Sequence, residues 1–277
     1  MSRPNPTVLF GFFVAVIVAM CGASLLKGGL YLGKHEGDTL HAAEIVFRMA
    51  DGQWPHLDFM TPIGILAFAP IALFVKMGYG VGMAFILAQT LVSVVLLPAV
   101  WWAAYSRMKG VVPYLFGAVV LVLIASLVHG EAQRSISVSM HYNRWAWAVA
   151  FVAIVLAVLP PLGRDRPALD GTLIGIAMAM LVLTKVTYAV AFAVPIFVAM
   201  LLYRRYRGLM AAVLSGFVVL LIFTAMAGIA VWPAYIKDLL LVSLGEVRPA
   251  PGEPFSAILG APAYIGASLT LIAGVIL

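Results

Sequence analysis

The stretch 80–104, GVGMAFILAQTLVSVVLLPAVWWAA, decides the fold class of this chain. It carries no charged side chain, and it is long enough to cross a lipid bilayer, which takes about 20 apolar residues in a helix. Similar apolar runs recur along the whole chain. They lie at about 7–26, 62–78, 111–128, 145–160, 171–184, 186–202, 209–231 and 257–277.

The overall composition gives the same result. Of the 277 residues, 64% are hydrophobic and 10% are charged, whereas about 25% are charged in a soluble domain. We therefore predict an all-α, polytopic bundle of about eight transmembrane helices, with residues 1–277 forming a single transmembrane domain. The last run reaches Leu277 without a polar flank, so we expect a chain truncated within a helix. The lone cysteine, Cys21, lies in an apolar run and excludes a disulfide framework.

The net charge of +6 reflects membrane topology and gives no sign of a nucleic-acid partner. Short loops between apolar runs carry the basic side chains, and the positive-inside rule expects these loops in the cytoplasm. These basic loops lie on the same side of the membrane as the N-terminus only if one of the early apolar runs does not cross the membrane. The basic residues concerned are Arg3, Arg107, Lys109, Arg164, Arg166, Arg204, Arg205 and Arg207.

The run 62–78 is the one that we expect not to cross. It is short, begins at Pro62, contains Pro70 and Lys76 and ends in a Gly-Tyr-Gly sequence, as expected of an interfacial or re-entrant segment. Residues 27–79 then form one outer juxtamembrane loop. Other outer loops fall at 129–144, near 185 and at 232–256, on the periplasmic side of a bacterial inner (plasma) membrane. The alternative is that every run crosses and the charge bias is reversed.

Residues 39–51 predict an amphipathic helix in the first outer loop. We expect it to lie on the membrane surface with its apolar face in lipid. The apolar face consists of Ala42, Ile45, Val46 and Met49, and the polar face of His41, Glu44, Arg48 and Asp51. The i,i+4 spacing of Glu44 and Arg48 predicts an ion pair.

Two aspartates flank this helix, and each has two interpretations. Asp38, just before the helix, is either its N-cap or a carboxylate facing a hydrophilic cavity, and these roles are compatible. Asp58 is either a second site carboxylate or a turn-forming residue.

The order of motifs in this region resembles a known family. One helix is followed by Gly37-Asp38, the interfacial helix, the sequence Gly-x-x-Pro-x-x-Asp-Phe at 52–59 and Pro-x-Gly at 62–64. This resembles the membrane glycosyltransferases of the GT-C fold, including aminoarabinose, mannosyl and galacturonosyl transferases that use polyprenyl-phosphate sugars. The resemblance implies a GT-C-like bundle, an inverting transferase and a catalytic aspartate at Asp38. It also implies a glycan, lipid or protein acceptor.

The second outer loop contains HGEAQR at 129–134 and HYNRW at 141–145. Polar groups at a helix mouth often line a substrate entrance, although His141, Arg144 and Trp145 also fit the role of interface anchors. Arg134 and Arg144 are candidates for binding the donor phosphate. His41, Glu44, Asp58 and His141 are candidates for binding substrate. Relatives carry a further acidic residue in this loop, for which only Glu131 is available here.

Lys185 interrupts two apolar runs in the sequence LTKVTY at 183–188. Such a lysine can extend to the membrane interface without any further role. It also resembles the family's lysine that faces the lipid phosphate, so we predict phosphate binding by Lys185.

No cofactor is assigned from the sequence. His35, Asp38, His41 and Glu44 fit no strong metal template, so a divalent metal is left open. Phosphate-loop and dinucleotide motifs are lacking. In the transfer that the resemblance implies, the lipid phosphate of the donor is itself the leaving group, so the protein needs no nucleotide-binding pocket. The alternative functions are a multi-pass transporter, which usually has mid-span charges, and a non-catalytic membrane scaffold.

Overall fold

The computed structural model describes residues 2–27, 31–32, 36–126, 135–136, 141–244 and 256. The chain divides into two compact units, Met1–Asp238 and Leu239–Leu277. The described residues form ten α-helices, one 3-10 helix and a parallel pair of two-residue strands, β1 (Tyr31–Leu32) and β2 (Ser135–Ile136). The prediction of an all-α fold is confirmed.

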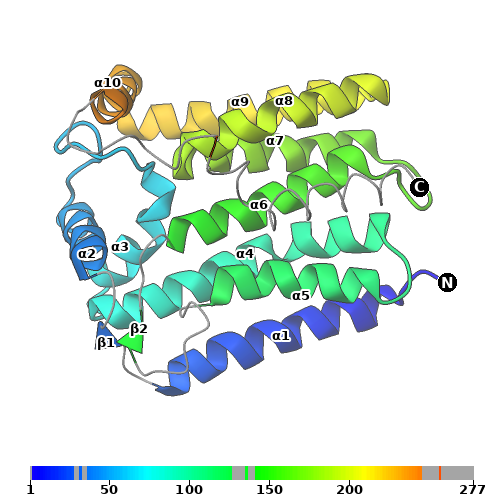
Figure 1. Ribbon diagram of the computed structural model, residues 1–277, viewed down its shortest axis with the longest axis horizontal. Helices are drawn as coiled ribbons and strands as arrows, with labels where there is room; N and C mark the ends of the chain where they lie inside the picture. Colours follow the sequence, from blue (N-terminus) through cyan, green and yellow to red (C-terminus); the bar gives the residue numbers. More distant parts are fainter. Residues whose placement is uncertain are drawn as a thin grey trace. The chain divides into compact units, whose positions relative to one another are not determined.

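Five helices are long and apolar enough to cross a membrane, as expected of a multi-pass membrane protein. They are α1 (Pro6–Lys27), α4 (Val81–Arg107), α6 (His141–Val158), α7 (Pro167–Thr184) and α9 (Tyr206–Ala227). Two shorter apolar helices, α5 (Val112–Ala125) and α8 (Val186–Leu202), run beside them (Figure 1). The eighth predicted span, 257–277, lies outside the described residues.

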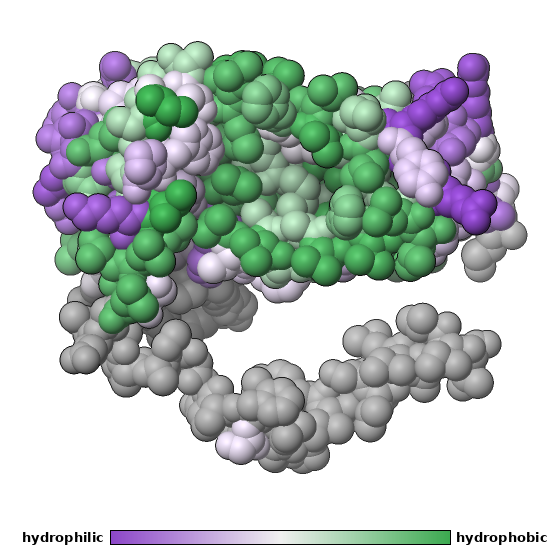
Figure 2. Space-filling model, turned by 90° about the horizontal axis from the view of Figure 1, so that it is seen from above, coloured by the Kyte–Doolittle hydropathy of each residue, from purple (hydrophilic) through white to green (hydrophobic). Residues whose placement is uncertain are grey.

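Hydrophobic side chains cover the middle of the helix bundle, and hydrophilic ones gather at its two ends (Figure 2). Large apolar residues remain exposed along this belt, for example Val190 on α8 and Val213 on α9, at 66% and 61%. A soluble protein rarely leaves such a continuous apolar surface uncovered. The pattern is that of a bundle whose outer surface faces lipid.

The basic loops meet at one end of the bundle, as the charge pattern predicts. The amide of Gly110 donates to the carbonyl of Ser2 at 3.1 Å, and the amide of Leu162 donates to the carbonyl of Ser106 at 2.9 Å. Arg205 donates to the carbonyl of Leu156 at 2.8 Å. We call this the basic end and the opposite end, which carries Lys185, the site end.

The run 62–78 does not form a continuous helix. It contains the 3-10 helix η1 (Ile65–Ala67) and the helix α3 (Ala69–Lys76). Eight helical residues extend about 12 Å, well short of the roughly 30 Å of a bilayer core. Both lie at the site end (Figure 1), which explains how the basic loops can share the other end.

Helix α2 (Glu36–Ala50) has the predicted apolar face but packs it differently from our expectation. Ala42, Ile45 and Val46 are buried in the hydrophobic core of the protein, and α3 is the neighbouring helix (Figure 1). The expected contact of this face with lipid is therefore wrong. Periodicity identifies a buried face, but it does not reveal what buries it. On the exposed side, Arg48 pairs with Glu44 at 2.9 Å, as predicted.

Two other boundaries differ from the sequence interpretation. The segment expected as an irregular loop from 232 contains helix α10 (Val231–Leu244). Helix α6 begins at His141, so the end of the expected loop 129–144 is helical. In α10, apolar residues at helical spacing continue the helix into a segment that also carries charges.

A buried ion pair joins helices at the basic end. Arg107, which the sequence suggests as a loop cation, is buried and pairs with Asp170 of α7. The other oxygen of Asp170 accepts from the indole of Trp102 at 2.8 Å. Because an unpaired charge in this interior would be costly, the pair fixes α4 against α7.

Helices α7 and α9 approach closely through small residues. A Cβ built on Gly171 would lie 2.0 Å from the carbonyl oxygen of Gly208, and one on Gly175 would lie 2.0 Å from that of Ala212. The i,i+4 spacing on each helix is the small-xxx-small pattern of membrane helix pairs. Close backbone packing therefore holds α9 onto α7.

Candidate functional site

The candidate site lies at the site end, where the loop after α2 meets the α7–α8 connection and the start of α10. The loop has a defined conformation. Gly52 has a φ of +92°, which ends α2. The carboxylate of Asp58 accepts from the amide of Trp54 at 2.7 Å. Asp58 therefore has the geometry of a turn-forming residue, which is one of the two interpretations that its sequence allows.

Gly64 brings this loop into contact with the α7–α8 connection. Its amide donates to the carbonyl of Thr184 at 3.0 Å. A Cβ at this position would lie 2.2 Å from the carbonyl oxygen of Leu183. Only glycine allows the two backbones to approach so closely. The Pro-x-Gly sequence therefore positions the first outer loop directly beside Lys185.

His56 and Asp238 connect the same loop to α10. Nδ1 of His56 lies 2.9 Å from Oδ2 of Asp238, and both side chains are buried. The amide of Thr61 donates to the same carboxylate oxygen at 3.1 Å. The His56 ring stacks on Tyr235, whose hydroxyl donates to the carbonyl of Val182 at 3.0 Å. The cluster links the loop, α10 and α7.

The protonation state of His56 follows from its surroundings. Burial lowers the pKa of His56 below its ordinary value of 6.5, although the hydrogen bond and charge of Asp238 act in the opposite direction. The ring is therefore mainly neutral at pH 7. A neutral imidazole carries its proton on one ring nitrogen, and Nδ1 is the nitrogen within hydrogen-bond distance of Asp238.

Lys185 is the single residue between α7 and α8. Its ammonium donates to Oδ1 of Asn143 at 3.0 Å. It also lies over the rings of Tyr142 and Tyr188, at 5.2 and 5.9 Å from their centroids. Cation–π contacts and the Asn143 amide hold the ammonium in place. Lys185 is thus a positioned cation at the site end.

The first turn of α6 lies beside Lys185. His141 is buried, and its Nε2 lies 2.7 Å from the carbonyl oxygen of Ala67. This contact holds η1 against α6. Nε and Nη2 of Arg144 are buried and have no hydrogen-bond partner within the described part of the chain. A buried guanidinium with free N–H groups is costly, so this arginine is suited to receive an anion.

The remaining predicted residues are distributed as follows. His41 and Glu44 lie on the exposed side of α2. Asp38 lies in the first turn of α2, because the helix begins at Glu36 and not after Asp38. The expectation that Asp38 is the N-cap is therefore wrong, and its side chain lies outside the described residues. Arg134 and Glu131 are also outside them, and no cluster of three metal-binding side chains occurs within the described ranges.

Sequence reasoning missed Asn143, Tyr235 and Asp238. Each belongs to a contact between residues far apart in the chain, which leaves no local pattern. Gly64 could have been identified from its place in the Pro-x-Gly sequence. Comparison of the chain with protein-family models, curated proteins and solved structures finds no match.

Proposed function

We propose that this protein is an inverting membrane glycosyltransferase that uses a polyprenyl-phosphate sugar as donor. One observation carries the proposal. The Lys185 ammonium, fixed by Asn143 and two tyrosine rings, lies at the same end of the bundle as α2, whose first turn contains Asp38. A cation for a departing phosphate and a carboxylate for an acceptor proton are the two groups that such a transfer needs.

The proposed reaction needs no nucleotide. The acceptor hydroxyl or amine gives its proton to Asp38 while its oxygen or nitrogen attacks the anomeric carbon. The bond from that carbon to the phosphate oxygen breaks, and the bonding electrons leave with the polyprenyl phosphate. Lys185 and Arg144 stabilise the charge that grows on the departing phosphate. Attack from the face opposite the phosphate inverts the anomeric centre.

The architecture suits a substrate carried by the bilayer. The donor's apolar chain would lie in lipid, with its phosphate at the level of Lys185. In this proposal the basic end faces the cytoplasm of a bacterial cell, as the positive-inside rule requires. The site end then faces the periplasm, where the acceptor is a glycan, a lipid or a protein.

The test is transfer by the purified protein in phospholipid vesicles. Radiolabelled sugars on polyprenyl phosphate are supplied with candidate acceptors, and both labelled product and free polyprenyl phosphate are measured. Transfer with one polyprenyl phosphate released per sugar is the expected result. A folded protein that moves intact donor or free sugar across the vesicle membrane, with no bond broken, would support a transporter instead.

A further inference from the structure

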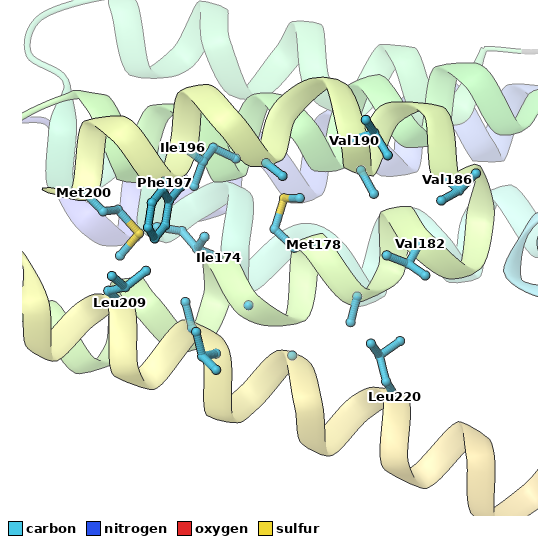
Figure 3. Close-up of a pocket in the computed structure, with 17 residues that line it drawn as sticks. Ile174, Met178, Val182, Val186, Val190, Ile196, Phe197, Met200, Leu209 and Leu220 are labelled. Carbon is cyan, nitrogen blue, oxygen red and sulfur yellow. The ribbon is translucent and has the colours of Figure 1, made fainter. Parts of the chain in front are cut away.

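An apolar groove of about 450 Å³ runs between α7, α8 and α9. All of its lining side chains are aliphatic or aromatic or belong to methionine, apart from two glycines. Figure 3 shows Val182, Val186 and Leu220 toward one end, with Met200, Leu209 and Phe197 at the other. Several lining residues are themselves exposed, including Val190 and Phe197 at 66% and 49%, so the groove opens onto the apolar belt.

The dimensions of the groove match one lipid chain. An apolar cavity of about 150 Å³ takes up benzene, which is about 25 Å³ per carbon atom. The groove therefore has room for roughly 18 carbons, the size of one common phospholipid acyl chain. Along α8 it extends from Val186 to Met200, which is about 21 Å at the helical rise per residue.

Arginines lie where the groove reaches the basic end. The connection between α8 and α9, residues 203–205, lies between Met200 and Leu209, two of the lining residues. Arg204 and Arg207, in or next to this connection, are exposed, whereas Arg205 donates to the carbonyls of Leu156 and Leu159. Exposed cations beside an apolar groove are suited to the head group of an anionic lipid.

We propose that this groove binds an anionic glycerophospholipid, with one acyl chain between α8 and α9 and its phosphate at Arg204 and Arg207. The lipid fills the gap that the described parts of α7, α8 and α9 leave between them. The charge at the basic end decides which way the lipid lies, with its phosphate at that end of the groove. At the other end, the cation Lys185 is already held by Asn143 and two tyrosines. This lipid is distinct from the proposed sugar donor, and the site does not depend on the proposed function.

Native mass spectrometry of the whole chain in detergent tests the site with phosphatidylglycerol as probe. Ala193 lines the groove and is exposed, whereas its neighbour Val194 is exposed but is not part of the lining. Ala193→Trp should weaken phosphatidylglycerol binding at least about tenfold, and Val194→Trp should leave it unchanged. Unchanged binding by Ala193→Trp would overturn the proposal.

Two further experiments test the site without any substitution inside the groove. Arg204→Gln with Arg207→Gln should reduce the affinity for phosphatidylglycerol to that for phosphatidylcholine with the same acyl chains. Equal binding of both lipids by the unmodified protein would contradict the assigned head-group site. A photoreactive group on the acyl chain should label groove residues of α8 and α9. Labelling confined to surfaces outside the groove, or displacement of the lipid by equimolar polyprenyl phosphate, would overturn the assignment.

Discussion

The ammonium of Lys185 donates a hydrogen bond to Oδ1 of Asn143 at 3.0 Å, and this contact joins the α7–α8 connection to the first turn of α6. The Tyr142 and Tyr188 rings lie on the same ammonium. Together these contacts hold the charge in one place. A cation held in a fixed position can stabilise the charge on a departing phosphate.

Removing this charge should slow sugar transfer. We expect Lys185→Ala to lower the turnover number by about 100-fold, the usual effect of losing one preorganised stabilising group. Asn143→Ala should have a smaller effect, because the ammonium remains but is less well positioned. Lys76→Ala, at an exposed lysine of the site end, is the control. Unchanged turnover in Lys185→Ala would remove this residue from the mechanism.

Gly64 should tolerate no side chain. In Gly64→Ala the new Cβ would meet the Leu183 carbonyl, and overpacking of this kind costs about 1–3 kcal/mol. We expect a lower thermal unfolding midpoint in detergent and reduced transfer, because the loop would move away from Lys185. Gly22→Ala in α1, where a Cβ meets no atom within 4 Å, should unfold like the unmodified protein. Equal midpoints for the two variants would show that the loop is not held there.

The buried His56 should make stability depend on pH. Because its pKa in the folded protein is below 6.5, the unfolded chain binds a proton more readily. Its contribution to the free energy of unfolding is thus complete above pH 6.5. It falls as the pH decreases from 6.5 towards the folded-state pKa.

The test compares unfolding free energies between pH 7.5 and about pH 5. His56→Asn should show a smaller decrease than the unmodified protein. Asparagine is chosen because it tolerates the φ of +71° at this position. His41→Asn, at an exposed histidine, should keep the full decrease. A pH profile that is the same with and without His56 would contradict the assignment.

The Arg107–Asp170 pair should be strongly coupled. Asp170→Ala leaves a buried guanidinium without its partner, and we expect a loss of about 3–5 kcal/mol in unfolding free energy. The double variant Arg107→Met with Asp170→Leu should regain much of this loss, since apolar side chains of similar size need no pairing. A double-mutant cycle on denaturant unfolding gives the coupling. Additive single effects would show that the two charges do not interact.

The sequence predicts local features of this fold well. The long apolar helices follow from length and hydropathy, and the shared basic end follows from the positions of the arginines. The Glu44–Arg48 pair and the Asp58 turn are also predictable, because each joins residues four positions apart. For the same reason, the small-xxx-small spacing at Gly171 and Gly175 is readable from the sequence, although the partner helix is not.

The tertiary contacts of the site were not predictable in this way. Asp238 contacts His56 across most of the chain, and an aspartate in α10 carries no local sign of this. The periodicity of α2 reveals its apolar face. It does not reveal whether lipid or protein covers that face, because both environments favour the same apolar residues. Arg107 reads as a loop cation because its partner, Asp170, lies on another helix.

Replacing the proposed base tests the central claim most directly. Sugar transfer from polyprenyl-phosphate donor should be measured for Asp38→Asn in phospholipid vesicles, with Glu36→Gln in the same helical turn as the matched control. We expect Asp38→Asn to fold normally and to lose at least about 100-fold in turnover, since general-base catalysis contributes about 10²–10⁴-fold. Glu36→Gln should remain active. Transfer by Asp38→Asn at the rate of the unmodified protein would contradict the account.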